Sequence, residues 1–476
     1  MFPPDTAFFQ TIAAPLRDTI GISLVGTGLG AAAGAVGTVL CNSYVNRCRW
    51  LRLALKAIVH LLRCIPVLVL ALLCTFLFGL GTRAGIAAIA VSTGAVLSRL
   101  GYEDSESADL QTAYALEYTG AGKVKAYIVS VGKQIFPGCL SNLLYILESN
   151  VRNAAVLGFV GAGGIGLLLN EKLAWREYGK AGAILCALYI VVFVTEFLSE
   201  FLREAFLAKE KLPGAKRLPA ILFLLFFISV LLFSVLGETS GAMNRNAFAS
   251  IVAGVVSPDV TMLFSLRQED VPALLVETFC IAFLGTVGGI VFALLFAVFA
   301  CFRFFGRAAV LMRLLLLVFR SVPVLVCGLL WVRVTGPGAF AGVMTLAVCS
   351  IGFLAKRFLI AIDSIDLRPY QALRAAGVTV LPAVRWGIAP QIVPHYVSAI
   401  LYRLDINLRE TAALGLVGAG GIGTPLFLAM NHYEWNQAGA LLWGVILLVA
   451  AVGAVSEKFR KDYRRGLFIL HPERGE

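Results

Sequence analysis

Two short groups of charged and polar residues recur in this chain with the same spacing. Glu148, Asn150 and Arg152 form the first group, and Asp405, Asn407 and Arg409 form the second, 257 positions later. On a helix, residues four apart share a face, so each acid can pair with its arginine. An arginine fork can also bind two oxygens of an oxyanion. Charges beside an apolar span should face a cavity or one another. We keep two interpretations, a gated anion path and a structural ion pair.

A glycine-rich block also occurs twice. Its glycines are Gly158, Gly161, Gly163, Gly164 and Gly166 in the first copy, and Gly415, Gly418, Gly420, Gly421 and Gly423 in the second. The spacing G-x-G-x-x-G satisfies a dinucleotide-binding pattern, which also requires a preceding strand, a βαβ unit and a later acidic residue. Both copies instead lie among long apolar segments. There, glycines let helices approach closely or end beside a cavity.

The remaining reactive side chains form no catalytic or metal-binding pattern. The ten cysteines include no Cys-x-x-Cys pair and fall mostly in apolar runs, as is typical of small buried residues. The four histidines lie far apart, with no ligand spacing. We therefore expect no metal site and no membrane-embedded enzyme.

Composition indicates an all-α polytopic membrane protein. Of 476 residues, 59% are hydrophobic and 14% charged, whereas soluble domains are nearer half apolar and a quarter charged. The net charge of +12 fits basic cytoplasmic loops better than nucleic-acid binding. About eleven stretches are long enough to span a bilayer. They lie near 18–40, 53–78, 84–100, 137–160, 180–202, 218–236, 273–301, 310–333, 339–360, 394–417 and 437–456. Basic clusters then place the N-terminus outside and the C-terminus in the cytoplasm.

Matches at a constant offset divide the chain into tandem parallel repeats. Arg63-Cys-Ile-Pro66 matches Arg320-Ser-Val-Pro323, and Gly26-Thr27 matches Gly285-Thr286 after a two-residue shift. We predict a first five-helix repeat at 1–210, a connecting transmembrane helix at 211–245 and a second repeat at 246–476. Repeats in membrane proteins commonly build a pathway between their halves.

The long polar segments 101–136 and 361–390 follow the third span of each repeat and should be cytoplasmic. In the second, small residues, a glycine and a further short helix suggest a helix–turn–helix along the membrane face. Such a surface can dock into a groove on a partner. A solvated linker is the alternative, but recurrence in both repeats favours docking.

These residues resemble the coupling loop of the permease subunits of ABC importers. The resemblance rests on Ala372, Leu373, Ala375, Ala376 and Gly377, and more weakly on Ala115, Leu116 and Gly120 in the first repeat. The glycine block and the residues from Arg403 to Glu410 are similar to the phosphonate and phosphite permease subfamily. Because two such permease subunits pair, this chain resembles a fused pair.

The resemblance implies a bacterial inner-membrane importer of a phosphonate-type oxyanion. An extracytoplasmic binding protein would deliver the ligand, and a cytoplasmic ABC ATPase dimer would bind the coupling loops. This chain would carry no cofactor; ATP and Mg²⁺ would bind the ATPase. No G-x-x-x-x-G-K-[ST] motif occurs in the chain itself.

The first repeat departs from the pattern. Tyr114 and Tyr118 stand where the second repeat has Gln371 and Ala375, and Lys133 stands where it has Pro390. The first coupling segment is therefore expected to bind its ATPase differently or weakly. Alternatives for the whole chain are an importer of methionine or another oxyanion, and an ion-coupled secondary transporter.

Overall fold

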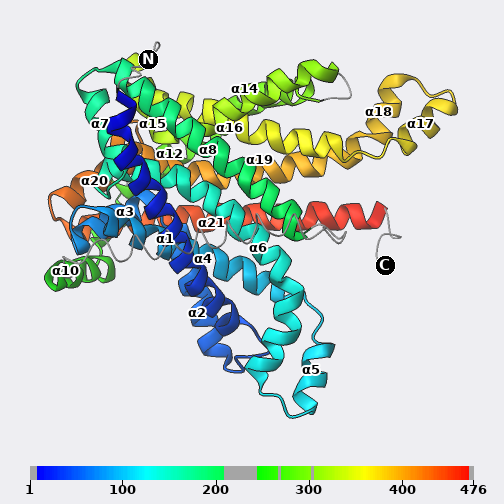
Figure 1. Ribbon diagram of the computed structural model, residues 1–476, viewed down its shortest axis with the longest axis horizontal. Helices are drawn as coiled ribbons and strands as arrows, with labels where there is room; N and C mark the ends of the chain where they lie inside the picture. The colour runs from blue at the N-terminus through cyan, green and yellow to red at the C-terminus, as the bar shows by residue number, and fades with distance from the viewer. Residues whose placement is uncertain (1–7, 208–243, 266–269, 302–304, 471–476) are drawn as a thin grey trace. The chain divides into compact units, whose positions relative to one another are not determined.

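The computed structural model describes residues 8–207, 244–265, 270–301 and 305–470 (Figure 1). They form helices joined by short turns, with no strand among them, and the chain divides into units Met1–Ile251 and Val252–Glu476. The first unit contains α1 (Phe9–Cys41), α2 (Arg49–Cys64), α3 (Val67–Phe78), α4 (Thr82–Glu106), α5 (Gln111–Tyr118), α6 (Lys123–Leu157), the 3₁₀ turn η2 (Gly158–Val160), α7 (Ile165–Ala174) and α8 (Tyr178–Leu207). Helix α10 (Arg245–Val256) contains the boundary.

The second unit repeats this order. It contains α11 (Val260–Phe264), α12 (Val271–Phe299), η3 (Gly306–Ala308), α14 (Ala309–Ser321), α15 (Val324–Thr335), α16 (Ala339–Asp363), α17 (Arg368–Ala375), α18 (Val380–Gly387), α19 (Ala389–Leu414), η4 (Gly415–Val417), α20 (Gly423–Asn431) and α21 (Trp435–Leu470). Helices α12, α14, α15, α16 and α19 stand where the first unit has α1, α2, α3, α4 and α6. The helical repeat of the fold is confirmed at this level.

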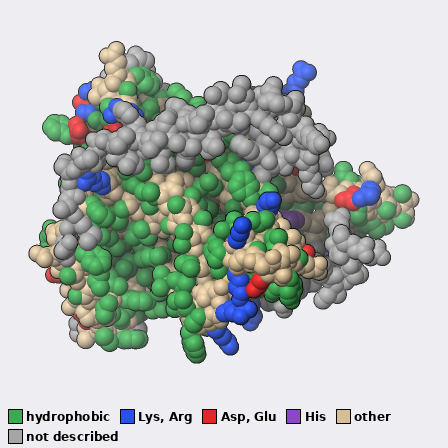
Figure 2. Space-filling model, turned by 60° about the horizontal axis from the view of Figure 1, so that its bottom comes forward, with side chains coloured by type: hydrophobic (Ala, Val, Ile, Leu, Met, Phe, Trp, Pro, Cys, Tyr) green, Lys and Arg blue, Asp and Glu red, His purple; other side chains and the backbone are tan. Residues whose placement is uncertain are grey.

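Six helices within the described residues are long and apolar enough to cross a membrane, and up to nine spans result if each bent pair counts as one. The six are α1, α4, α8, α12, α16 and α21. Helix α19 forms over the predicted span 394–417 but is not among them, and it carries Arg403, Asp405, Arg409 and Glu410. The predicted span 218–236 and most of the connecting segment 211–245 lie outside the described residues. Hydrophobic side chains dominate the face seen in Figure 2.

Two predicted spans are broken at a proline. Helices α2 and α3 meet at 97°, and α14 and α15 at 83°, so 53–78 and 310–333 are not straight spans as predicted. The breaks fall at Ile65-Pro66 and Val322-Pro323. Proline lacks an N–H, and its ring pushes the preceding residue into extended backbone, as seen at Ile65 and Val322. The recurring Arg-x-x-Pro motif therefore marks a sharp corner.

Close helix packing through small residues holds each unit together. Helices α1 and α4 pack along their length in the first unit, as α12 and α16 do in the second. A Cβ added at Gly30 would lie 2.6 Å from the Thr93 Cβ, and one at Gly289 would lie 2.6 Å from the Ser350 Cβ. Only glycine allows these backbones to approach so closely, as in many membrane helix pairs.

Candidate functional site

The acid and the arginine of each recurring group form an ion pair within one helix. Glu148 Oε1 lies 2.8 Å from Arg152 Nη1 on α6, and Asp405 Oδ2 lies 2.5 Å from Arg409 Nη2 on α19. The acid side chains are 2% and 7% exposed, whereas the arginine side chains are 19% and 21% exposed. Each carboxylate is thus buried, and its guanidinium extends toward accessible surface. A competing anion can reach the arginine before it reaches the acid.

The asparagine between them joins three helices. In the first unit Asn150 Nδ2 donates to Thr27 Oγ1 on α1 and Thr93 Oγ1 on α4, both at 2.8 Å. In the second unit Asn407 Nδ2 donates to Thr286 Oγ1 at 2.8 Å and Ser350 Oγ at 3.0 Å. Hydrogen bonds between membrane helices average about 0.6 kcal/mol each, with a maximum near 1.7. These bonds hold the helix that carries each ion pair against the long helix pair of its own unit.

The second unit carries an additional buried ion pair. Arg403 Nη2 lies 3.0 Å from Glu410 Oε2, and Arg403 Nε donates to Ser350 Oγ at 3.0 Å. At offset 257 the first unit has Ile146 and Asn153, which cannot form this pair. Arg403 is buried, and its guanidinium also lies over the Phe353 ring. The polar core of the second unit is therefore more highly charged.

The glycine blocks form tight turns after α6 and α19. Gly161, Gly163 and Gly164, like Gly418, Gly420 and Gly421, have positive φ angles that favour glycine. The amide of Ile165 donates to Thr19 Oγ1 (2.7 Å), and the amide of Ile422 donates to Thr278 Oγ1 (2.9 Å). Both described blocks follow a helix rather than a strand, so the dinucleotide pattern lacks its structural context. The block ends one helix and starts the next.

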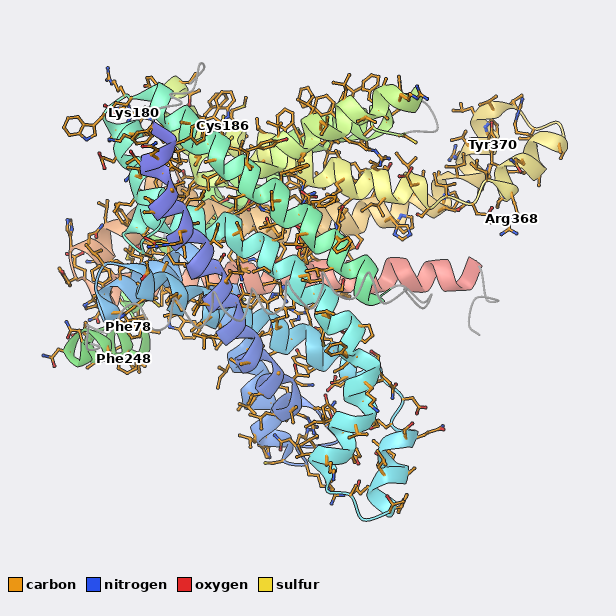
Figure 3. The ribbon with its side chains drawn as sticks, in the orientation of Figure 1. Phe78, Lys180, Cys186, Phe248, Arg368 and Tyr370 are labelled. Carbon is orange, nitrogen blue, oxygen red and sulfur yellow. The ribbon has the colours of Figure 1, made fainter. Side chains whose placement is uncertain are left out.

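The predicted coupling residues lie at the ends of the long helices (Figure 1). Ala115 and Leu116 are on α5, Ala372, Leu373 and Ala375 are on α17, and Ala376, Gly120 and Gly377 follow these helices. Gly120 and Gly377 have φ of 91° and 83°. No residue of α17 is buried, and Figure 3 shows Arg368 and Tyr370 on this projecting helix.

A glutamine holds each coupling segment to the helix that follows it. Gln134 Oε1 accepts from the Asp109 amide (3.1 Å), and Gln134 Nε2 donates to the Asp109 carbonyl (2.9 Å). Gln391 makes the same two bonds with Asp366 (3.0 and 2.9 Å) and a third to the Gly387 carbonyl (2.7 Å). Sequence reasoning missed these residues, although the offset of 257 and the repeated Asp and Gln would have indicated them.

The two coupling segments differ in structure. In the second unit α18 ends at Gly387 and α19 begins at Ala389, so α17, the Gly377 turn and α18 form the predicted helix–turn–helix. In the first unit α6 runs without a break from Lys123. Pro390 has no N–H to continue a helix, whereas Lys133 has one. The replacement noticed in the sequence therefore changes the architecture of the segment.

A charge reversal accompanies this difference. Arg374 Nη1 donates to the Val378 carbonyl (2.9 Å) and closes the second turn. Its counterpart Glu117 instead accepts a hydrogen bond from the Tyr44 hydroxyl at 2.9 Å. Burial, followed by this hydrogen bond to the Glu117 carboxylate, raises the pKa of Tyr44 to about 12. The Tyr114 ring packs edge-on against Tyr44, with centroids 5.3 Å apart. Aromatic packing thus fastens the first segment to the end of α1.

Within the described residues, no group of three His, Cys, Asp or Glu side chains could hold a metal ion.

Comparisons with known proteins give consistent matches. The family model described as "Binding-protein-dependent transport system inner membrane component" matches residues 26–211 and 289–461. The phosphate-import permease of Mycolicibacterium smegmatis is 28% identical over 461 residues, covering 96% of this chain and 86% of that protein. The phosphite transport system permease of Stutzerimonas stutzeri is 30% identical over 251 residues, covering 52% and 88%. An inward-facing methionine ABC transporter aligns with TM-score 0.35 at 22% identity, over 46% of this chain and 99% of that chain.

Proposed function

Since the chain belongs to the family of binding-protein-dependent transport system inner membrane components, we propose that it is the permease of an ATP-driven importer of phosphonate or a related phosphorus oxyanion. The main support is that the family model matches twice, once in each repeat. Relatives named for phosphate, phosphite and phosphonate support the substrate class. One chain would then supply both permease units of the importer.

The coupling segments are the proposed docking sites for a separate ABC ATPase dimer. Each unit carries one, at the end of its long helices, with the same glutamine clamp behind it. ATP and Mg²⁺ would bind that ATPase, and an extracytoplasmic binding protein would deliver the ligand. The proposal has the N-terminus outside and the C-terminus in the cytoplasm of a bacterial inner membrane. The basic residues Arg47 and Arg49 lie on the coupling-segment side of the first unit, as the positive-inside rule requires.

Arg152 and Arg409 are proposed to contact the anion on its path. Their partly exposed guanidinium groups can pair two phosphonate oxygens, while the buried acids hold them in place between transport events. Arginine binds such groups in a planar bidentate arrangement that lysine cannot reproduce.

In the deciding experiment, the tagged chain is purified from its native membrane in mild detergent together with any bound proteins. The eluate is then assayed for ATP hydrolysis and for ligand specificity. We expect an ATPase at about two copies per chain. In proteoliposomes, hydrolysis should be stimulated by the binding protein loaded with phosphonate, phosphite or phosphate, and not with methionine. Stimulation by methionine alone would identify the chain as the permease of a methionine importer instead. Relatives named for D-methionine transport support this second candidate. A chain that elutes alone and transports on an ion gradient would refute the importer.

Unequal docking of the ATPase at the two coupling segments is a separate expectation. Cysteines placed at Ala115 and at Ala372, one at a time, should crosslink to the ATPase with different yields, because only the second segment has a separate short helix, α18, after its turn. Both positions are exposed, so accessibility is matched. Equal yields would refute the asymmetry and leave the importer proposal intact.

A further inference from the structure

The glycine turn of the second unit, residues 418–421, binds a carboxylate of its own unit. Glu277 Oε1 on α12 accepts a hydrogen bond from the Gly421 amide at 3.0 Å. A Cβ added at Gly420 would lie 3.0 Å from the same oxygen. Gly420 and Gly421 have positive φ, and successive amides in such turns form concave sites for anions. The second turn is therefore occupied by a negatively charged group that the chain itself supplies.

The equivalent turn of the first unit, residues 161–164, has no such carboxylate. Asp18 stands 259 positions before Glu277, and its side chain is one carbon shorter. Asp18 Oδ1 instead lies 3.6 Å from Arg17 Nη2, and the Asp18 side chain is 42% exposed. Among the described residues, no group accepts a hydrogen bond from the Gly164 amide. Gly164 is partly exposed, whereas its counterpart Gly421 is buried. The first turn is thus open where the second is closed.

Positive charge lies beside the open turn. Arg17 is on α1 next to Asp18, and its side chain is 75% exposed. Arg83 is in the first turn of α4, which packs against the glycine turn. The second unit has Val276 and Phe340 at these two positions. Asp18 opposes an anion at this place, but Arg17 is paired with it. The surroundings of the open turn therefore favour an anion more than those of the closed turn.

The open turn lies at the end of α6 that is remote from the coupling segment. Helix α6 has 35 residues, roughly 52 Å at 1.5 Å per residue. Figure 1 shows α5 and α7 at opposite ends of the first unit. Gly164 is the N-cap of α7, so the partial positive charge of a helix start adds to that of the arginines. In the proposed importer, this is the side from which the ligand arrives.

We propose that the open glycine turn of the first unit is an outer binding site for the phosphorus oxyanion that the permease transports. The Gly164 amide and the Arg17 guanidinium donate hydrogen bonds to its oxygens, as the Gly421 amide does to Glu277 in the second unit. Glu277 closes the second turn, so the anion enters through the first unit. The inference rests on the importer function proposed above. A lipid headgroup presents similar phosphate chemistry, and the experiment separates it from the transported anion.

Two substitutions at Asp18 test the site in opposite directions. Inorganic phosphate is titrated by calorimetry into the full chain in lipid-free detergent at fixed ionic strength. Asp18→Glu adds the missing carbon, so an attached carboxylate competes for the turn at high effective concentration and should weaken phosphate binding roughly tenfold or more. Asp18→Asn removes the opposing charge at constant size and should tighten binding severalfold. Because both changes are small, opposite effects cannot arise from general damage to the fold.

A pair of arginine variants separates the site from the overall charge of the chain. Arg17→Gln should weaken phosphate binding about two- to fivefold, the range of an exposed ion pair. Arg333→Gln removes the same charge from an exposed position near the end of α15 in the second unit, and should leave the affinity unchanged. Equal losses in the two variants would show non-specific attraction and refute the site.

The remaining outcomes are equally decisive. Absence of phosphate binding to the parent at millimolar concentrations, or parent-like affinity of Asp18→Glu, would overturn the outer site. Loss of phosphate binding when phosphatidylglycerol is added would assign the turn to a lipid headgroup and would overturn it as well. The importer itself is tested separately, by the stimulation of ATP hydrolysis by the loaded binding protein. Stimulation of the parent together with failed phosphate binding would refute this site alone and leave the importer proposal intact.

Discussion

Replacing single glycines with alanine should separate two reasons why this chain needs glycine at particular positions. Gly423 begins α20 with ordinary helical backbone, yet a Cβ there would overlap the carbonyl oxygen of Ala412. Gly336 has φ of +87°, and a Cβ there would meet nothing within 4 Å. Gly132 is helical, and the nearest atom to its Cβ would be 3.8 Å away. Gly423 therefore tests steric overlap with the backbone, Gly336 tests backbone conformation, and Gly132 is a control that involves neither.

The expected losses differ in size. Gly423→Ala should cost about 3 kcal/mol, the upper end for overpacking, because a backbone carbonyl cannot rotate aside. Gly336→Ala should cost about 1–2 kcal/mol, because φ of 87° with ψ of 168° lies in a positive-φ region that is essentially restricted to glycine. Gly132→Ala should be neutral or stabilise by up to about 1 kcal/mol, the helix preference for alanine. A unit of this size loses about 2–4 °C of melting temperature per kcal/mol. The melting temperature of Gly423→Ala should therefore lie roughly 6–12 °C below that of the parent, and that of Gly336→Ala roughly 2–8 °C below it.

The assay is the monodisperse fraction left after heating the detergent-extracted chain, followed by fluorescence-detected size exclusion. If Gly423→Ala and Gly132→Ala have the same melting temperature, the overlap argument is wrong and the block does not need glycine for packing. If Gly336→Ala falls as far as Gly423→Ala, conformation rather than packing dominates.

Three further changes give distinct outcomes. Gln391→Leu removes three hydrogen bonds and should raise backbone hydrogen exchange across 368–387 severalfold by mass spectrometry; unchanged exchange would show that the clamp is unimportant. Arg409→Ala should abolish uptake with unchanged elution, whereas parent-rate uptake would refute the pathway role and restoration by exchanging Asp405 and Arg409 would support a structural pair. Because the folded-state pKa of Tyr44 is raised to about 12 from about 10, its stabilisation is complete below pH 10 and lost by pH 12. Melting temperature measured against pH should therefore fall more steeply in that window for the parent than for Tyr44→Phe.

Much of the fold can be predicted from the sequence because the chain contains two copies of one unit, and each motif can be compared with its counterpart. The offset of 257 pairs Glu148 with Asp405, and helical spacing alone puts each acid beside its arginine. The same offset pairs the glycine turns, and the offset of 259 pairs Thr19 with Thr278, but the sequence does not say that these hydroxyls bond to the turns. A hydroxyl can bond along its own helix or across to a neighbour, and only packing decides.

The corners at Pro66 and Pro323 could not be located from apolar length. A span is counted by hydrophobic residues, and α2 with α3 contains enough of them even though the chain turns by 97° between the two. The helical periodicity of α2 carries a further signal. Its residues form an apolar stripe and a basic stripe at helical spacing, which a fully buried or lipid-surrounded span does not need. Counting apolar residues without asking which face they occupy does not reveal where a span bends.

The differences between the two units are more informative about function than the features they share. Three features recur in both units, as expected of features that any unit of this fold needs: the hydrogen bonds of Asn150 and Asn407, the glycine turns, and the ion pairs Lys56–Glu106 and Arg313–Asp363. The charge reversal from Glu117 to Arg374 and the additional Arg403–Glu410 pair do not recur. A buried charge pair is costly to retain and can often be replaced by apolar residues at no loss of stability. Because Ile146 already occupies the Arg403 position in the first unit, the fold itself does not require that charge. The unequal docking of the ATPase proposed for this permease should therefore depend on unmatched residues such as Glu117 and Arg374.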